Sequence, residues 1–360
     1  MRQIREKTFI AISANLKKSD DYKSFISKVQ KKIDDFTLYP SFNIPVKRSD
    51  GKIEMKPYKI GVQADARDKR YLKILSSISN VEELLFLSPS KLLQRYEKLK
   101  FFKLEEKDPI DNCFSHTIQA LLWYSELRSG SKKMLYSFYK ELGIKSCIYC
   151  NSQHTLLLKD LEKTMRLQAD HYIAKSSFPT FSITLSNLYP VCNNCNHLKN
   201  DKEILYSLYY NESKDTAHDL GFELDKKSIT DYCLNRNTAN PENHLKLEFR
   251  DYYKGDVNQS SKLNEVLKID KIYENHKDII ADLINKKIVY NESYLQTLTE
   301  KFGQLFKRPD GKINMQLLNQ MLYGHSLEDD DINKRVFSKL IIDIKKQLDS
   351  FDFITKEKNS

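Results

Sequence analysis

The sequence lacks long hydrophobic segments. No uncharged apolar run reaches the roughly 18 residues that a membrane-spanning helix requires, so we expect no such helix. The first residues are charged, but the apolar stretch behind them is short and is broken by Ser13 and Asn15. We therefore expect no cleavable signal peptide and a cytoplasmic location. A Walker A pattern is also lacking, so any nucleotide hydrolysis would belong to a partner chain.

What is present indicates a folded protein with anionic partners. The chain has 360 residues, of which 40% are hydrophobic and 30% charged, and this balance is typical of globular proteins. Its length predicts two or three folding units. A net charge of +10 favours polyanions such as nucleic acid, although the lysines are scattered along the chain.

The first predicted region, residues 1–140, is mainly helical. Its clearest helix lies in residues 88–102, where Ser88 can cap the helix and Pro89 suits the first helical position. Residues Asn43–Met55 alternate around a Ser-Asp-Gly turn and predict a β-hairpin. Residues 141–210 differ in character and form the predicted central module.

The third predicted region, residues 211–355, is again mainly helical. It contains one plausible strand, Leu245–Tyr253, and apolar residues at helical spacing predict a helix over Lys262–Ile288 and another around Val336–Leu348. The expected fold class is therefore α+β, with a compact central module between two helical regions.

The six cysteines give the strongest signal. Four of them form two CxxC pairs: Cys147 with Cys150, and Cys192 with Cys195. In a reducing compartment such pairs favour a metal over disulfides, and four thiolates are the ligand set of a closed structural zinc site. Cys113 and Cys233 stand alone and are expected to be buried apolar side chains. A Cys₄ site by itself would also fit a zinc-stabilised interaction module.

The residues between and after the cysteine pairs carry further chemistry. Asp170 and His171 are adjacent, Asn187 lies five residues before Cys192, and Asn196 directly follows Cys195. Histidine titrates near neutral pH and can serve as a general base. A neighbouring carboxylate can hold a hard cation such as Mg²⁺, and a base with a cation is what phosphodiester hydrolysis needs.

This arrangement resembles the HNH endonuclease family, whose ββα-metal fold is a β-hairpin and a helix around one catalytic cation. The matching segments are CIYC, ADHYIAKSSFP and SNLYPVCNNCNHLK, within residues 147–201. The resemblance implies that His171 is the general base and that Asp170 is the first ligand of a catalytic Mg²⁺ or Mn²⁺. It further implies that Asn187 fixes the loop that orients His171, and that Asn196 offers its side-chain oxygen to the cation. The chain would then be an HNN variant with a second, structural Zn²⁺, and its products would carry a 5′-phosphate and a 3′-hydroxyl.

Three further residues are candidate nucleic-acid contacts. His197 could be argued to be the third motif position, but it lies about 100° around the helix from Asn196, so only one of them can face the cation. We favour Asn196 and expect His197 to face DNA or solvent. Lys199, one turn further on, and Lys175 are predicted to contact backbone phosphate, with solvated surface lysines as the alternative.

The spacing through the central module particularly resembles that of bacterial HNH proteins from anti-phage defence and retron-associated operons, which work beside a partner ATPase. The sequence therefore predicts a metal-dependent DNA endonuclease. Two alternatives stay open. One is a non-catalytic zinc module that binds nucleic acid or protein, and the other is an HNH nuclease that acts on RNA.

Overall fold

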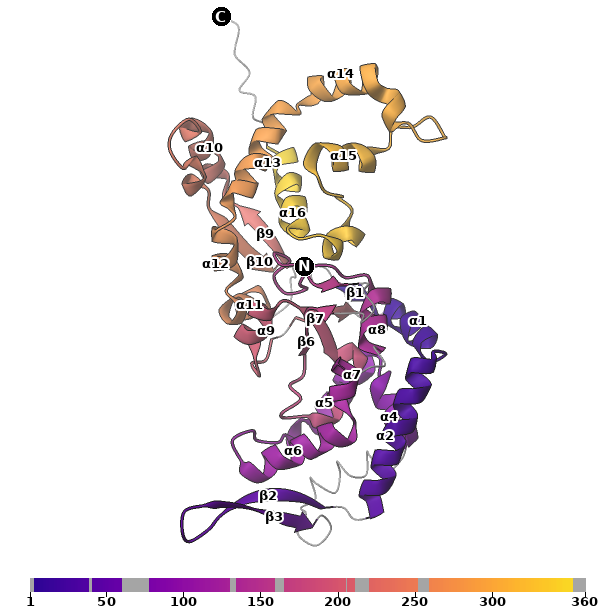
Figure 1. Ribbon diagram of the computed structural model, residues 1–360. Helices are drawn as coiled ribbons and strands as arrows, with labels where there is room; N and C mark the ends of the chain where they lie inside the picture. Colours follow the sequence, from indigo (N-terminus) through magenta and orange to yellow (C-terminus); the bar gives the residue numbers. More distant parts are fainter. Residues whose placement is uncertain are drawn as a thin grey trace, which may run out of the picture.

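Helices dominate both ends of the chain, and a short strand–strand–helix segment lies between them (Figure 1). The computed structural model describes residues 3–38, 41–59, 78–129, 134–158, 165–204, 206–210, 220–251 and 259–351. The helices of the first region are α1 (Glu6–Leu16), α2 (Asp20–Leu38), α4 (Ile78–Leu85), α5 (Pro89–Leu99), α6 (Pro109–Leu121), α7 (Tyr124–Ser129) and α8 (Met134–Leu142). The later helices are α9 (Asn193–Lys199), α10 (Lys226–Asn235), α11 (Gln259–Leu267), α12 (Ile269–Glu274), α13 (Lys277–Val289), α14 (Glu292–Phe302), α15 (Met315–Tyr323) and α16 (Ser338–Asp349).

The strands of the described residues pair only in twos. They are β1 (Ile4–Arg5), β2 (Ser41–Lys47), β3 (Ile53–Lys59), β4 (Leu156–Leu157), β5 (Met165–Arg166), β6 (Gln168–His171), β7 (Leu188–Val191), β8 (Tyr209–Tyr210), β9 (Leu220–Leu224) and β10 (Leu247–Asp251). The β1–β8 pair is parallel, and the other pairs are antiparallel. Small antiparallel sheets among many helices confirm the α+β class.

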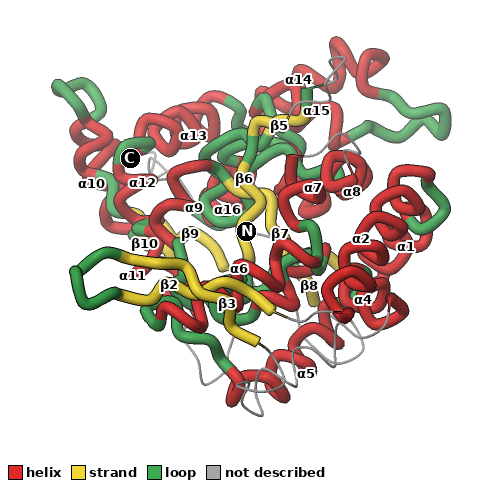
Figure 2. Tube along the Cα trace, turned by 60° about the horizontal axis from the view of Figure 1, so that its bottom comes forward, coloured by secondary structure: helices red, strands yellow, loops and turns green. Residues whose placement is uncertain are grey.

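The predicted hairpin near residue 50 is confirmed as β2 and β3. Gly51 closes its turn at a φ of 83°, a backbone conformation that favours glycine, and the Gly51 amide donates to the Arg48 carbonyl at 2.9 Å. The hairpin packs against α6, as Figure 2 shows. It therefore lies beside one wall of the cavity described below.

Helix α5 also forms where it was predicted. Ser88 precedes it in extended conformation and Pro89 takes the first helical position, although the Ser88 hydroxyl makes no capping hydrogen bond. Together with α4, this helix buries a small apolar cluster that includes Leu92, Phe178 and Phe181. Because each such buried side chain contributes about 1.5–3 kcal/mol, this packing holds the loop between β6 and β7 against the helical region.

The prediction of one helix over Lys262–Ile288 is wrong, because the segment forms three helices, α11, α12 and α13. The first break is at Lys268, whose φ of 55° is left-handed and cannot continue a helix. The second is at His276, which precedes α13. These breaks turn α12 so that Tyr273 is fully buried. The strand β10 lies within its predicted range, and the last helix, α16, begins two residues after the predicted start and ends one residue past the predicted end.

One buried apolar cluster runs through all three predicted regions, with members such as Phe9, Tyr189 and Leu348. The cluster connects the helices at the start of the chain, the central strands and the last helix, and this shared core fixes the position of the central segment. Among the described residues, no helix is both long and apolar enough to cross a membrane.

Candidate active site and four-cysteine cluster

The four predicted cysteines converge in the structure. The sulfur atoms of Cys147, Cys150, Cys192 and Cys195 all lie within 4.8 Å of one another, and all four residues are buried. The Cys150 and Cys192 sulfurs are 4.0 Å apart, close to the edge of about 3.8 Å expected for a tetrahedron with zinc–sulfur bonds of 2.3 Å. The four-cysteine cluster can therefore hold a metal ion and is compatible with a structural zinc.

The chemistry of the donor set supports the same conclusion. Burial raises the pKa of the Cys147 thiol, because a buried thiolate is poorly solvated. Four thiolates this close together would therefore need a cation to balance their charge. The lone cysteines, Cys113 and Cys233, lie outside this cluster. They are half-buried rather than fully buried as predicted, and each packs at the margin of the core.

The first cysteine turn also anchors the C-terminal helices. Asn151 follows Cys150 at a φ of 53°, a conformation that asparagine tolerates better than most residues. Its side-chain amide donates to the carbonyls of Ile332 and Arg335 at 3.0 and 3.1 Å, and its side-chain oxygen accepts from the Lys339 amide at 3.0 Å. One side chain thus joins the cysteine turn to the start of α16.

The central segment runs from β6 through β7 to α9. Strands β6 and β7 pair antiparallel, with Asp170 opposite Tyr189 and His171 opposite Leu188. Helix α9 follows directly, and the Cys192 sulfur that precedes it accepts a hydrogen bond from the Cys195 amide at 3.5 Å. The second cysteine pair therefore sets where α9 begins, and α9 packs against β6.

His171 is buried, and one of its ring nitrogens is fixed. Its Nε2 lies 3.0 Å from the carbonyl oxygen of Ser182. Because a carbonyl only accepts, Nε2 must carry the proton, and Nδ1 is the free acceptor of the neutral ring. Among the described residues no hydrogen bond reaches Nδ1. Burial lowers the pKa of His171 to about 3, so the ring is neutral at neutral pH.

Asp170 is held by two buried partners. The Tyr149 hydroxyl donates to its Oδ2 at 2.6 Å, and the Lys199 ammonium donates to its Oδ1 at 3.3 Å. The same ammonium donates to the His171 carbonyl at 2.7 Å. Burial raises the pKa of the Asp170 carboxyl, while the Lys199 charge and the Tyr149 hydroxyl oppose that rise.

This arrangement contradicts the prediction that Lys199 contacts backbone phosphate. Only 1% of its side chain is exposed, and its ammonium is bonded inside the protein. The physical reason is that Lys199 ends α9, which packs directly on β6, so the side chain reaches Asp170 instead of solvent.

Asn187 is fully buried and brackets the loop between β6 and β7. Its side-chain oxygen accepts from the Ile173 amide at 2.7 Å, and its side-chain nitrogen donates to the carbonyls of Ile173 and Phe181 at 3.0 and 3.1 Å. Its own carbonyl accepts from the Tyr172 amide at 2.9 Å. The loop that begins at His171 is therefore pinned at both ends by one residue.

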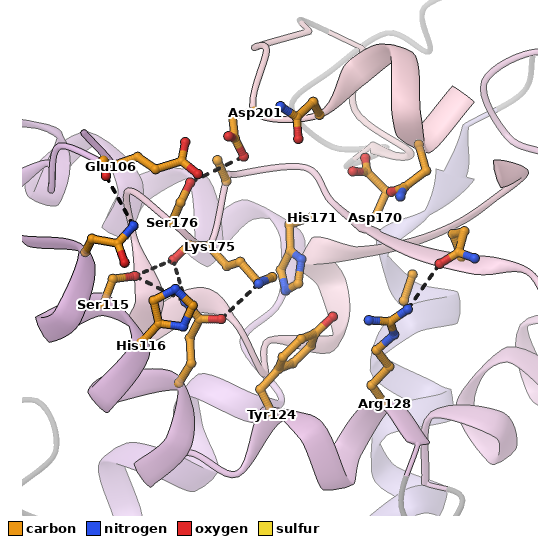
Figure 3. A pocket seen from close by; sticks show the side chains of 17 residues that line it. Glu106, Ser115, His116, Tyr124, Arg128, Asp170, His171, Lys175, Ser176 and Asp201 are labelled. Carbon is orange, nitrogen blue, oxygen red and sulfur yellow. Dashed lines mark hydrogen bonds between the residues drawn. The ribbon is translucent and has the colours of Figure 1, made fainter. Parts of the chain in front are cut away.

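A cavity of about 320 Å³ lies beside β6 (Figure 3). Its lining includes Tyr124, Arg128, Asp170, His171, Lys175 and Asn196. Asn196 is half-buried and lines this cavity, whereas His197 is exposed and is not among the lining residues. Of the two candidates for the third motif position, Asn196 is thus the one that shares a cavity with Asp170 and His171.

Nothing in the sequence indicated that residues of α7 would line the cavity. Tyr124 and Arg128 come from α7, and the Tyr124 ring packs 5.0 Å from the His171 ring, measured between centroids. Burial raises the pKa of Tyr124 to about 12, so its hydroxyl keeps its proton. Neither residue belongs to a recognisable motif. Tyr149, by contrast, stands inside the CIYC turn, where its partnership with Asp170 could have been suspected.

Two residues of the cavity lining could contribute oxygen ligands to a hard divalent cation. The Asp170 carboxylate and the Asn196 amide both offer oxygen, and the carboxylate also accepts hydrogen bonds from Tyr149, Lys199 and the His171 backbone. Mg²⁺ commonly combines one or two carboxylates with water and substrate phosphate. Among the described residues, only the four-cysteine cluster groups three or more Cys, His, Asp or Glu ligands closely enough for one ion, so no all-protein cage surrounds this cavity.

Comparisons of the chain with protein-family models, with curated proteins and with solved structures found no match.

Proposed function

We propose that the protein is a metal-dependent HNH endonuclease that hydrolyses phosphodiester bonds of DNA. The observation that supports this most is that Asp170, His171 and Asn196 line one cavity. They are the three side chains to which the resemblance assigns the base and the cation ligands. The ββα order of β6, β7 and α9 around them agrees with that assignment.

In the proposed mechanism His171 takes the proton of the attacking water at Nδ1. The hydrogen bond from Nε2 to the Ser182 carbonyl selects this tautomer and fixes the ring plane. Asn187 holds the backbone that follows His171 and so positions the base. The low pKa makes the ring a weak base, and the negative charge of a bound phosphate would raise that pKa toward a useful value.

Asp170 and Asn196 would hold Mg²⁺ or Mn²⁺, which when bound neutralises charge on the phosphate and the leaving oxygen. Tyr149 and Lys199 hold the Asp170 carboxylate in position. The Lys199 charge also lowers the affinity of the carboxylate for a cation, so we expect a substrate phosphate to be needed for tight metal binding. The four-cysteine cluster would carry Zn²⁺ with no open position for water, and this zinc is structural.

Plasmid cleavage tests the proposal. Purified protein with Mg²⁺ or Mn²⁺ should nick or linearise supercoiled DNA, and His171→Ala should abolish cutting while zinc content and folding stay unchanged. His244→Ala is a matched control, because His244 is exposed and lies outside the cavity. Cutting by His171→Ala at the wild-type rate would refute the assignment of the base.

The ion pair between Asp170 and Lys199 favours a second candidate function. A carboxylate that is already paired can be purely structural, and the protein would then be a non-catalytic zinc module that binds nucleic acid or protein. In that case the wild-type protein would bind DNA yet cut none with either metal, so the same assay separates the two functions.

An HNH nuclease that acts on RNA is the remaining alternative to the DNA endonuclease, and a partner ATPase in an anti-phage defence complex is a further part of the proposal. The positive net charge suits DNA and RNA alike, and the partner ATPase rests on the resemblance. Cleavage of matched DNA and RNA oligonucleotides decides the first. Co-purification with an ATPase encoded beside this chain would support the second.

A further inference from the structure

Two cationic side chains on the helical side of the cavity lack acidic partners. The Arg128 guanidinium donates to the side-chain oxygen of Gln168 at 3.3 Å, and the Lys175 ammonium donates to that of Gln119 at 3.0 Å. Both acceptors are neutral amides. Within the described part of the chain, neither cation forms an ion pair.

Both cations lie near Tyr124. Figure 3 shows Lys175, His171 and Arg128 gathered around Tyr124. The Lys175 ammonium lies 5.3 Å from the centroid of the Tyr124 ring, which gives it a cation–π contact. The Tyr124 ring therefore supports the Lys175 ammonium at the cavity wall.

The two cations at this wall repel each other. Burial lowers the pKa of Lys175, and the Arg128 charge lowers it further. The same two cations add to the effect of burial in lowering the pKa of His171. Asp201 and Glu106 also line the cavity and partly offset these charges. A ligand that carries a negative charge between Arg128 and Lys175 would reduce this repulsion.

We propose that Arg128 and Lys175 form a phosphate-binding subsite for a backbone phosphodiester next to the one that is cut. The guanidinium fork suits two phosphate oxygens, and the ammonium adds a point charge from the other side. The subsite rests on the proposed function for the identity of the polyanion. It makes α7, which lies before the cysteine turns in the chain, part of the substrate site.

Binding without cutting tests the subsite. The His171→Ala protein is titrated, with no added divalent cation, into fluorescent DNA and RNA oligonucleotides of one sequence, and anisotropy is measured from 50 to 300 mM NaCl. Either substitution, Arg128→Gln or Lys175→Gln, is then added to the His171→Ala protein. Each should make the negative slope of log K against log salt concentration shallower by about one. At 0.1 M salt the affinity for duplex DNA should fall about eightfold for each lost contact.

Two further variants sharpen the result. Arg128→Lys keeps the positive charge and should therefore keep most of the salt slope. It should lose part of the affinity, because lysine cannot make the two-pronged contact of a guanidinium with phosphate. Lys301→Gln removes one charge from an exposed position on α14 and should change neither quantity. Unchanged slopes in both Arg128→Gln and Lys175→Gln, or no binding of either oligonucleotide, would overturn the subsite.

The outcomes also separate this inference from the proposed function. If the wild-type protein cuts no nucleic acid but the slopes fall as expected, the subsite stands and the nuclease proposal fails. If the protein cuts while the slopes stay unchanged, the nuclease stands and the subsite fails.

Discussion

The hydroxyl of Tyr273 donates a 2.6 Å hydrogen bond to the backbone carbonyl of Cys150. The two residues are 123 positions apart, and Tyr273 is fully buried. The bond joins α12 to the first cysteine turn, beside the link that Asn151 makes to the start of α16. The cysteine turn therefore serves two purposes. It forms half of the four-cysteine cluster, and it holds the C-terminal helices.

Removing this hydroxyl should destabilise the protein. Tyr273→Phe leaves the Cys150 carbonyl buried without its partner, at a cost of about 1–3 kcal/mol in the free energy of unfolding. Urea unfolding followed by circular dichroism measures the change. Tyr294→Phe is the matched control, because Tyr294 is 42% exposed. Equal stability of the two variants would show that the Tyr273 bond contributes nothing.

Loss of a cysteine ligand should have a far larger effect. Cys147→Ser should lose bound zinc and unfold the central segment, because a structural zinc contributes on the order of 10 kcal/mol to folds of this kind. Metal content by mass spectrometry and thermal unfolding measure the two effects. Cys233→Ser, at a half-buried position outside the cluster, should leave both nearly unchanged. A folded Cys147→Ser protein with a full complement of zinc would contradict the ligand assignment.

The buried pair of Lys199 and Asp170 should show strong coupling. Lys199→Met leaves the carboxylate without its counter-charge and should cost about 3–5 kcal/mol of stability. The double variant Asp170→Asn with Lys199→Met removes both charges and should lose much less than the sum of the single variants. Urea unfolding of the four proteins gives the coupling energy. An additive cycle would mean that the two charges do not interact.

His171 should make the protein sensitive to acid. Its pKa is about 3 in the folded protein against an ordinary value near 6.5, so the unfolded chain binds a proton first as the pH falls. Stability should therefore drop between about pH 6.5 and pH 3, with this residue contributing a slope of up to about 1.4 kcal/mol per pH unit. His171→Asn should flatten the pH dependence of the urea midpoint, whereas His244→Asn at an exposed position should not. Identical slopes in wild type and His171→Asn would refute the burial of a neutral ring.

Local features of the fold followed well from the sequence. Pro89 marked the start of α5, and the Ser-Asp-Gly turn marked the β2–β3 hairpin, because both depend on backbone conformations that neighbouring residues set. The continuous helix over Lys262–Ile288 failed for the opposite reason. Its apolar spacing persisted through Lys268, but packing of Tyr273 against the cysteine turn requires breaks in the backbone there.

By itself, the sequence determined which residues can carry chemistry. Each CxxC spacing defines one half of the four-cysteine cluster, since a tight turn brings the two cysteines of a pair together whatever surrounds it. Only the tertiary structure decided which residues these side chains contact. Lys199 turned inward to Asp170, and Arg128 came to the same cavity from α7, because packing of helices against β6 sets such contacts between residues far apart in the chain.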